Sequence, residues 1–251
     1  RSLNADMKPP DLEKLLSLKP LIILSLFLLS LSSIAFYSLR IPIGSPPPEI
    51  LPPDLKIRPG YDSYDAYIHR QLNKTLNEKL RQIWKTRDWD RKVRVFSAFF
   101  QSLKERNLLS NDSRSLCIGA RVGQEVAALR RVGVRDSLGM DLVPAPPLVV
   151  GGDFHRQPFG DGSFDFEFSN VFDHALFPWK FVGEIERTLK PGGVCVLHVL
   201  ISRRADKYSA NDLYSVNPLQ KLFSKSDLVE VREIDGFGLD TEVVFRKTKK
   251  K

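Results

Sequence analysis

A short apolar run that ends in two glycines, Ser115 to Gly123, constrains the fold of this chain more than any other stretch. Residues 124–131 continue it with small apolar side chains at helical spacing, so the pattern predicts a strand, a glycine turn and a helix. Such a turn brings backbone N–H groups and the positive end of the helix to one place, which suits a nucleotide-like ligand. Asp141 follows Gly119 by 22 residues, at the expected end of a second strand, where a carboxylate can accept hydrogen bonds from ribose hydroxyls.

Beyond residue 110, apolar runs alternate with helical segments, and this alternation predicts a parallel sheet with helices on both faces. The predicted strands are 115–118, 136–140, 148–150, 164–169 and 194–200. A helix is expected over 178–189, and residues 229–234 and 242–246 should close the sheet as an antiparallel pair. The expected fold class is therefore α/β with a Rossmann-like sheet.

Several motifs in a fixed order point to one family. They are the Gly119/Gly123 pair, Asp141, Asp153, Phe164-Asp165 and Leu189-Lys190-Pro191-Gly192-Gly193. At these residues the chain resembles the class I S-adenosylmethionine-dependent methyltransferases, most closely the type 11 branch, and it also looks like the plant membrane-anchored methyltransferase-like proteins. The resemblance covers roughly residues 111–200 and implies S-adenosylmethionine as the cofactor.

The resemblance also implies a set of site residues. Those implied to bind the cofactor are Gly119, Ala120, Arg121, Gly123, Asp141, Leu142, Asp153 and Phe154. The glycine turn would pass under the methionine portion and Asp141 would hold the ribose. Asp153 would accept from the adenine amino group, and Phe154 would line the ring.

The acceptor side of the predicted site follows the fourth strand. Asn170 lies where the family places residues near the transferred methyl, and Asp173-His174 comes directly after it. A histidine beside a carboxylate can act as a general base near neutral pH. The alternative is that His174 only makes hydrogen bonds within its loop. Asn170, Asp173 and His174 are therefore the candidate catalytic residues.

Two positions depart from the family pattern. Cys117 stands where the family usually has an acidic residue that helps to hold the methionine ammonium. Arg121 replaces the middle glycine of the turn, where it could either pair with the cofactor carboxylate or obstruct the pocket.

The N-terminal third of the chain predicts an anchor and a spacer. Residues 20–39 carry no charge, and a helix of this length reaches about 30 Å, the thickness of a bilayer core. We interpret them as a transmembrane signal-anchor after a tail of residues 1–19; a cleavable signal peptide is the alternative. Residues 40–60 are a Pro-rich linker, and 61–251 are the predicted methyltransferase domain, with N-terminal helices over 61–110 and the Rossmann-like core over 111–251.

Charge suggests the topology of that anchor. Lys8, Lys14 and Lys19 precede the span and favour a cytosolic N-terminus, which would place the domain in a lumen of the endomembrane system, ER or Golgi. Glycosylation sequons at Asn73 and Asn111 fit that topology.

Two amphipathic helices are expected between Tyr61 and Leu109, where they would cover the sheet edge and wall the cofactor cleft. Between them, Asp88-Trp89-Asp90 has the Asp-x-Asp form of metal-dependent glycosyltransferases. It does not follow a strand, so coincidence is the simpler reading.

Composition excludes other classes. The net charge is +8, but five positive residues lie in the last six positions, so the sequence does not predict a nucleic-acid surface. Cys117 and Cys195 are expected to be buried and free, and the four histidines are too scattered for a metal site.

Three functions remain open from the sequence. The first is an S-adenosylmethionine-dependent methyltransferase, anchored to a membrane, that acts on a small molecule or a secretory-pathway polymer. The second is a catalytically silent relative that serves as a membrane-tethered binding or scaffold protein. The third is a type II glycosyltransferase.

Overall fold

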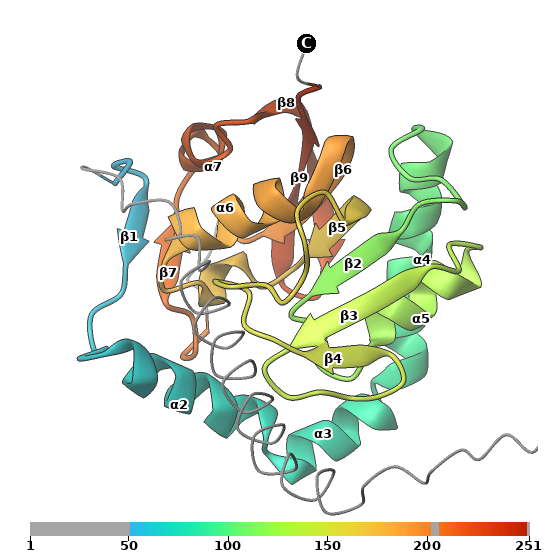
Figure 1. Ribbon diagram of the computed structural model, residues 1–251. Helices are drawn as coiled ribbons and strands as arrows, with labels where there is room; N and C mark the ends of the chain where they lie inside the picture. Colours follow the sequence, from blue (N-terminus) through green and yellow to red (C-terminus); the bar gives the residue numbers. More distant parts are fainter. Residues whose placement is uncertain (1–50, 202–205, 250–251) are drawn as a thin grey trace, which may run out of the picture. The chain divides into compact units, whose positions relative to one another are not determined.

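A seven-stranded sheet organises the residues that this computed structural model describes, 51–201 and 206–249 (Figure 1). The strands lie side by side in the order β4 (Val149–Gly151), β3 (Ser137–Asp141), β2 (Ser115–Ile118), β5 (Phe164–Ser169), β6 (Leu189–Val199), β9 (Leu239–Lys247) and β8 (Ser226–Gly236). The first five are parallel, and β9 is antiparallel to both of its neighbours. The predicted parallel sheet and its closing antiparallel pair are confirmed.

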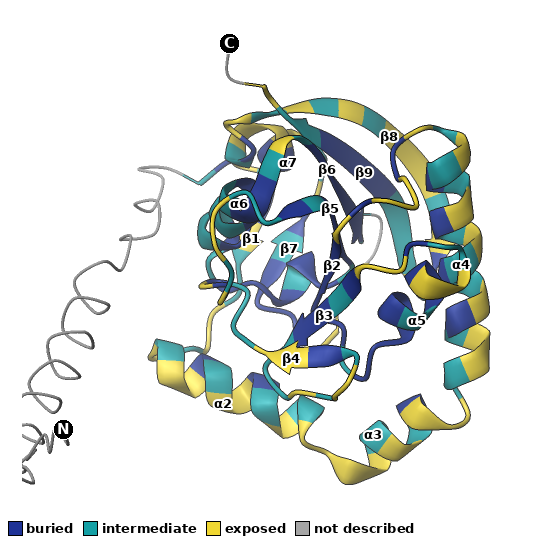
Figure 2. Cartoon of the chain, turned by 45° about the vertical axis from the view of Figure 1, so that its right-hand side comes forward, coloured by how far each residue is buried: buried dark blue, intermediate teal, exposed yellow. Residues whose placement is uncertain are grey.

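Helices cover both faces of this sheet, as the alternating pattern predicts. On one face α4 (Trp89–Glu105) and α5 (Gln124–Arg131) pack against side chains such as Phe166 and Phe168. On the other, α6 (Pro178–Thr188) and α7 (Asn217–Leu222) pack against Leu116, Ile118 and Leu197. Successive strand residues therefore serve opposite faces. Figure 2 shows the central strands largely buried, whereas the edge strands β4 and β8 are partly exposed. Cys117 and Cys195 lie on these buried strands as free thiols, as predicted.

The segment before the sheet contains three helices rather than the two expected. α2 (Tyr64–Thr75) is followed by α3 (Glu78–Lys85), and α4 comes next. The apolar spacing runs through without a gap, but the Asn77 side chain accepts a hydrogen bond from the backbone N–H of Leu80 at 3.0 Å and caps α3. α2 and α3 run past the carboxyl ends of β2, β3 and β4 (Figure 1).

The Asp-x-Asp motif belongs to the start of α4. Asp88 is the N-cap residue and Asp90 lies in the first turn. Carboxylates are favoured at a helix N-terminus because they complement its positive end. This position accounts for the motif without any glycosyltransferase chemistry.

Residues before the predicted domain boundary at 61 also take part in the described fold. β1 (Leu55–Ile57) lies inside the range assigned to the linker and pairs antiparallel with β7 (Asn211–Leu213). Leu55 is only 2% exposed and joins the main core. An ion pair of 2.7 Å between Arg58 and Asp212 holds the same pairing.

Within residues 51–201 and 206–249, no helix has both the length and the apolar character needed to cross a membrane. The predicted anchor at 20–39, the tail before it and residues 40–50 of the predicted linker lie outside the described residues.

Candidate active site

A pocket lies where the winding of the sheet reverses. From β2 the chain moves outward to β3 and β4, then returns to place β5 on the other side of β2. Ligands in open α/β sheets bind at such a switch point, beyond the carboxyl ends of the strands. The pocket has about 490 Å³ of empty space, part of it open to solvent. Its lining residues are Gln71, Lys74, Thr75, Trp84, Gly119, Arg121, Asp141, Leu142, Phe154, Val171 and His174.

The glycine turn after β2 forms the floor of this pocket. Gly119, Arg121 and Gly123 all have positive φ, at 74°, 51° and 91°. A Cβ at Gly119 would lie 2.4 Å from Cγ2 of Val171, so no other residue fits there without displacing the neighbouring loop. Arg121 holds a left-handed conformation that is unfavourable for a side chain of its kind.

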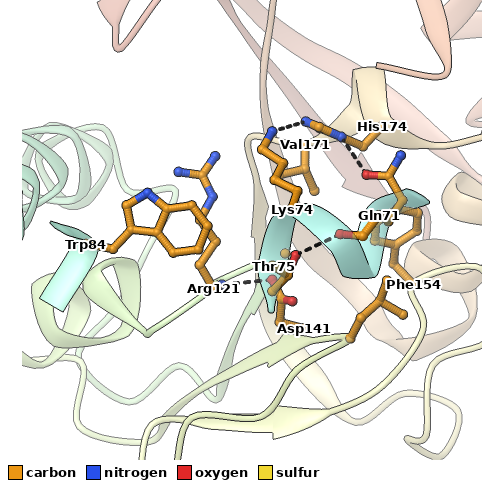
Figure 3. A pocket seen from close by; sticks show the side chains of 11 residues that line it. Gln71, Lys74, Thr75, Trp84, Arg121, Asp141, Phe154, Val171 and His174 are labelled. Carbon is orange, nitrogen blue, oxygen red and sulfur yellow. Dashed lines mark hydrogen bonds between the residues drawn. The ribbon is translucent and has the colours of Figure 1, made fainter. Parts of the chain in front are cut away.

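The Arg121 side chain lies at one end of the pocket. Its guanidinium stacks over the Trp84 ring at 5.3 Å from the centroid, and Figure 3 shows the two together. No described residue forms an ion pair with it. Its backbone N–H donates to Oδ2 of Asp141 at 2.9 Å. The side chain thus stays in the pocket, positively charged and available to an anion.

Asp141 and Leu142 line the pocket, as the resemblance implies, but Asp141 also has a structural task. Its Oδ1 accepts a second backbone hydrogen bond, from Val143 at 3.3 Å. Burial raises the pKa of its carboxyl, while the backbone donors and Arg121 oppose that change. Each carboxylate oxygen has two lone pairs, so Asp141 can tie the glycine turn to β3 and still accept from a ribose hydroxyl.

Asp153, implied to bind the adenine amino group, does not line the pocket. The Tyr64 hydroxyl of α2 donates to its Oδ2, and the backbone N–H of His155 donates to its Oδ1 at 2.9 Å. Phe154 does line the pocket. The resemblance could not indicate the Tyr64–Asp153 hydrogen bond, because Tyr64 lies 89 residues earlier and reaches Asp153 only through the packing of α2.

His174 lies at the other end of the pocket, in the short 3-10 helix η1 (Phe172–His174). The Gln71 amide donates to the backbone oxygen of Tyr208 at 2.8 Å, which turns its Oε1 toward Nδ1 of His174 at 3.0 Å. Nδ1 must therefore carry the proton, and Nε2 is left as the acceptor. Burial lowers the pKa of His174, so the ring is neutral at neutral pH. Neutral imidazole with an acceptor nitrogen is the form required of a general base.

Lys74 completes this end of the pocket. Its Nζ is 3.3 Å from Nε2 of His174 (Figure 3). The same Nζ is 2.9 Å from a carboxylate oxygen of Asp206. Asp173, predicted to pair with the histidine, is 3.9 Å from Nε2 and instead accepts from the Ser209 hydroxyl. Asp173 therefore lies near His174, but Gln71 rather than Asp173 holds the ring by a hydrogen bond.

Ligand atoms of Asp173, His174 and Asp206 lie within 4.8 Å of one another, a spacing that a metal ion could use. The ammonium of Lys74 is already bonded to two of the three. A lysine cation therefore supplies the positive charge at this cluster, and a metal would have to displace it.

Asn170 is not among the residues that line the pocket. Its Nδ2 donates to Oε1 of Glu125 at 3.4 Å. Sequence reasoning missed Glu125, and it also missed Gln71, Lys74 and Trp84, which reach the pocket from α2 and α3. Helical periodicity separates the polar face of such helices from the apolar one, but it does not show which part of the sheet they cover.

The comparisons with known proteins agree with this geometry. Residues 116–197 match the family model described as a methyltransferase domain. Proteins described as "Uncharacterized methyltransferase" from two Mycobacterium strains, KMS and MCS, are 36% identical over 93 residues, which cover 33% of this chain. The chain spans about a third of the length of these relatives, 36%.

Solved structures resemble the chain over a longer range. The 1,6-didemethyltoxoflavin-N1-methyltransferase of Burkholderia thailandensis, with bound S-adenosylhomocysteine, has a TM-score of 0.57 at 17% identity and covers 81% of this chain and 100% of its own. A putative methyltransferase from Haloferax volcanii, in complex with the Trm112 activator, has a TM-score of 0.53 at 18% identity, over 76% of this chain and 100% of its own. The [4+2]-cyclase SpnF has a TM-score of 0.51 at 14% identity, over 61% of this chain and 81% of its own.

The pocket, the glycine turn and the strand order therefore agree with the family match. The residues present also fit the cofactor of that family, because Asp141 faces the pocket with acceptor capacity and Arg121 offers an unpaired cation there. Residues 116–197 therefore match a methyltransferase domain, and the strand order and pocket of the described residues agree with that match.

Proposed function

We propose that the protein transfers a methyl group from S-adenosylmethionine to an oxygen or nitrogen nucleophile. The observation that carries this proposal is the pocket at the switch point, with the glycine turn and Asp141 at one side and the Lys74–His174 pair at the other. One half suits a nucleoside, and the other half holds a base. A small molecule or a secretory-pathway polymer is the proposed acceptor.

S-adenosylmethionine supplies a methyl group on a sulfonium, and its C–S bond breaks as an acceptor lone pair forms the new bond to carbon. The acceptor loses a proton in the process, and Nε2 of His174 is the candidate to receive it. Lys74 makes a shorter contact to Asp206 than to His174, 2.9 against 3.3 Å. An acceptor hydroxyl can therefore replace Lys74 at Nε2 while Lys74 remains paired. Gln71 holds the ring so that this nitrogen faces the pocket.

We also propose that residues 20–39 tether this domain to an endomembrane, with the N-terminus in the cytosol. The support is the uncharged length of the segment and the lysines before it. The proposal predicts that the full chain resists extraction from membranes by alkaline carbonate. Release of the full chain by carbonate would contradict it.

A second candidate function is a silent binding module. Arg121 in the glycine turn and the Tyr64 hydroxyl on Asp153 both occupy positions that the cofactor would use. The cyclase among the structural relatives also shows that this fold does not require methyl transfer. The enzyme would transfer the methyl group of the bound cofactor, whereas the silent module would bind the cofactor without transferring it.

The test is transfer of radiolabelled methyl from S-adenosylmethionine by the full chain. Small-molecule and macromolecular fractions of a cell extract are offered separately, and His174→Gln is compared with the unaltered chain. The proposal expects labelled product in one fraction, and a variant that still binds the cofactor but transfers far less. Cofactor binding without transfer to either fraction would favour the silent module.

A further inference from the structure

We propose that Glu125 binds the ammonium of the cofactor's amino-acid portion, and that Lys92 and Arg121 bind its carboxylate. This inference rests on the proposed function and names the residues that would hold one end of its cofactor. It starts from three charged side chains for which the fold alone gives no explanation.

Glu125 is a buried carboxylate with half of its hydrogen bonding unfilled. It is the second residue of α5, two residues after the glycine turn, and it is 4% exposed. Oε1 accepts from Asn170, but Oε2 is buried and has no hydrogen-bond partner. Leaving a carboxylate oxygen buried without a donor is costly, and such an atom in a native fold usually has a partner that is missing from the structure. An ammonium from a bound ligand would be that donor.

Two cations contact aromatic rings: the Arg121 guanidinium lies over Trp84 and Nζ of Lys92 lies over Phe237, at 5.3 and 5.4 Å from the ring centroids. The charges of Arg121 and Lys92 both act on Glu125 against the effect of burial, which raises the pKa of its carboxyl. Neither forms an ion pair with a residue in the described part of the chain. Burial and the nearby Arg121 lower the pKa of Lys92 to about 8, although Glu125 and Asp88 act in the opposite direction. A ligand carboxylate would give both cations an anionic partner.

One unfilled carboxylate beside two unpaired cations matches a zwitterion rather than a simple anion. A phosphate would pair with Arg121 and Lys92, but it would bring no ammonium donor to Oε2 of Glu125. An α-amino acid satisfies all three, because its ammonium and carboxylate are attached to one carbon. S-adenosylmethionine ends in such a group.

The neighbouring strand does not offer an alternative carboxylate. Cys117 of β2 is fully buried, and burial together with the Glu125 charge raises the pKa of its thiol. The thiol is therefore neutral and cannot hold an ammonium. In this chain the negative charge beneath the turn comes from α5 instead of from β2.

Three ligands test the ammonium contact and the carboxylate contact separately. S-adenosylmethionine carries both charges, decarboxylated S-adenosylmethionine keeps only the ammonium, and 5′-methylthioadenosine lacks the amino-acid portion. Their affinities for the full chain are measured by titration calorimetry with Glu125→Gln, Lys92→Met and the unaltered chain. Glu105→Gln, an exposed position in α4, is the matched control.

Glu125→Gln should weaken binding of both ligands that carry the ammonium by about 10- to 100-fold, the loss expected for a hydrogen bond between charged groups. Lys92→Met should weaken S-adenosylmethionine alone. Neither variant should change the affinity for methylthioadenosine, which also serves as the check that each variant is folded.

Two results would overturn the inference alone: wild-type affinity for S-adenosylmethionine in both variants, or an equal loss for methylthioadenosine. If the unaltered chain binds none of the three ligands, the proposed function fails with it.

Discussion

Replacing Lys92 with methionine should make the protein more stable, because this lysine is retained at an energetic cost. Its pKa falls from the usual 10.5 to about 8 through burial and the repulsion of Arg121 and Lys74, which outweigh Glu125 and Asp88. At about 1.4 kcal/mol for each pKa unit, the difference corresponds to about 3 kcal/mol of unfavourable free energy in the folded state. Methionine has a similar length and no charge, so Lys92→Met should recover most of it.

The pH dependence gives this prediction a second readout. Below pH 8 the folded and unfolded states both carry the proton, so the unaltered chain bears the full cost. Between about pH 8 and 10.5 the unfolded state binds more protons than the folded state, and the stability of the unaltered chain rises with pH. The advantage of Lys92→Met should therefore be largest at pH 7 and vanish above pH 10.5.

Urea unfolding at pH 7 and pH 10.5 measures both quantities. With a slope of about 2–3 kcal/mol per M, the midpoint of Lys92→Met should lie about 1 M higher at pH 7. Lys221→Met, at an exposed position on α7, is the control and should change stability by no more than about 0.5 kcal/mol. A variant that is no more stable at pH 7, or that keeps its advantage at pH 10.5, would refute the reasoning.

Three further predictions concern the pocket. Gly119→Ala should destabilise the fold by about 1–3 kcal/mol more than Gly238→Ala in thermal melts, because both have positive φ but only the first would clash with a neighbour; equal losses would contradict this. His174 should remain neutral at pH 6.5 with its proton on Nδ1 in nitrogen NMR spectra, and Gln71→Ala should weaken that preference; an imidazolium at pH 6.5 would be the contrary result. Tyr64→Phe removes the hydroxyl that donates to Asp153; if Asp153 binds the adenine amino group, as the resemblance implies, calorimetry should show tighter S-adenosylmethionine binding, and weaker binding would assign the hydroxyl to the site itself.

The sequence predicts the core of the fold well, since hydrophobic periodicity reports directly on burial. The strand 164–169 and the helix 124–131 are found with the expected bounds. The pattern is less informative where an element is short. β1 has three residues, and its pairing with β7 joins segments more than 150 positions apart, so nothing local distinguishes it from the proline-rich spacer before it.

The candidate site also has one part that the sequence predicts and another part that it does not. Gly119, Asp141 and His174 follow strands in order, so the carboxyl edge of the sheet brings them together. Lys74 and Trp84 arrive from helices whose placement depends on tertiary packing. The contacts of Asp153 and His174 could not be predicted for that reason, because Tyr64 and Gln71 reach them from α2.

Titration calorimetry of the full chain with S-adenosylmethionine tests the central claim most directly. Binding at the switch-point pocket predicts saturation at one molecule per chain, and a large loss of affinity in Asp141→Ala, since that carboxylate lines the pocket and fixes the turn. No saturable binding, or equal binding by the variant, would contradict the account.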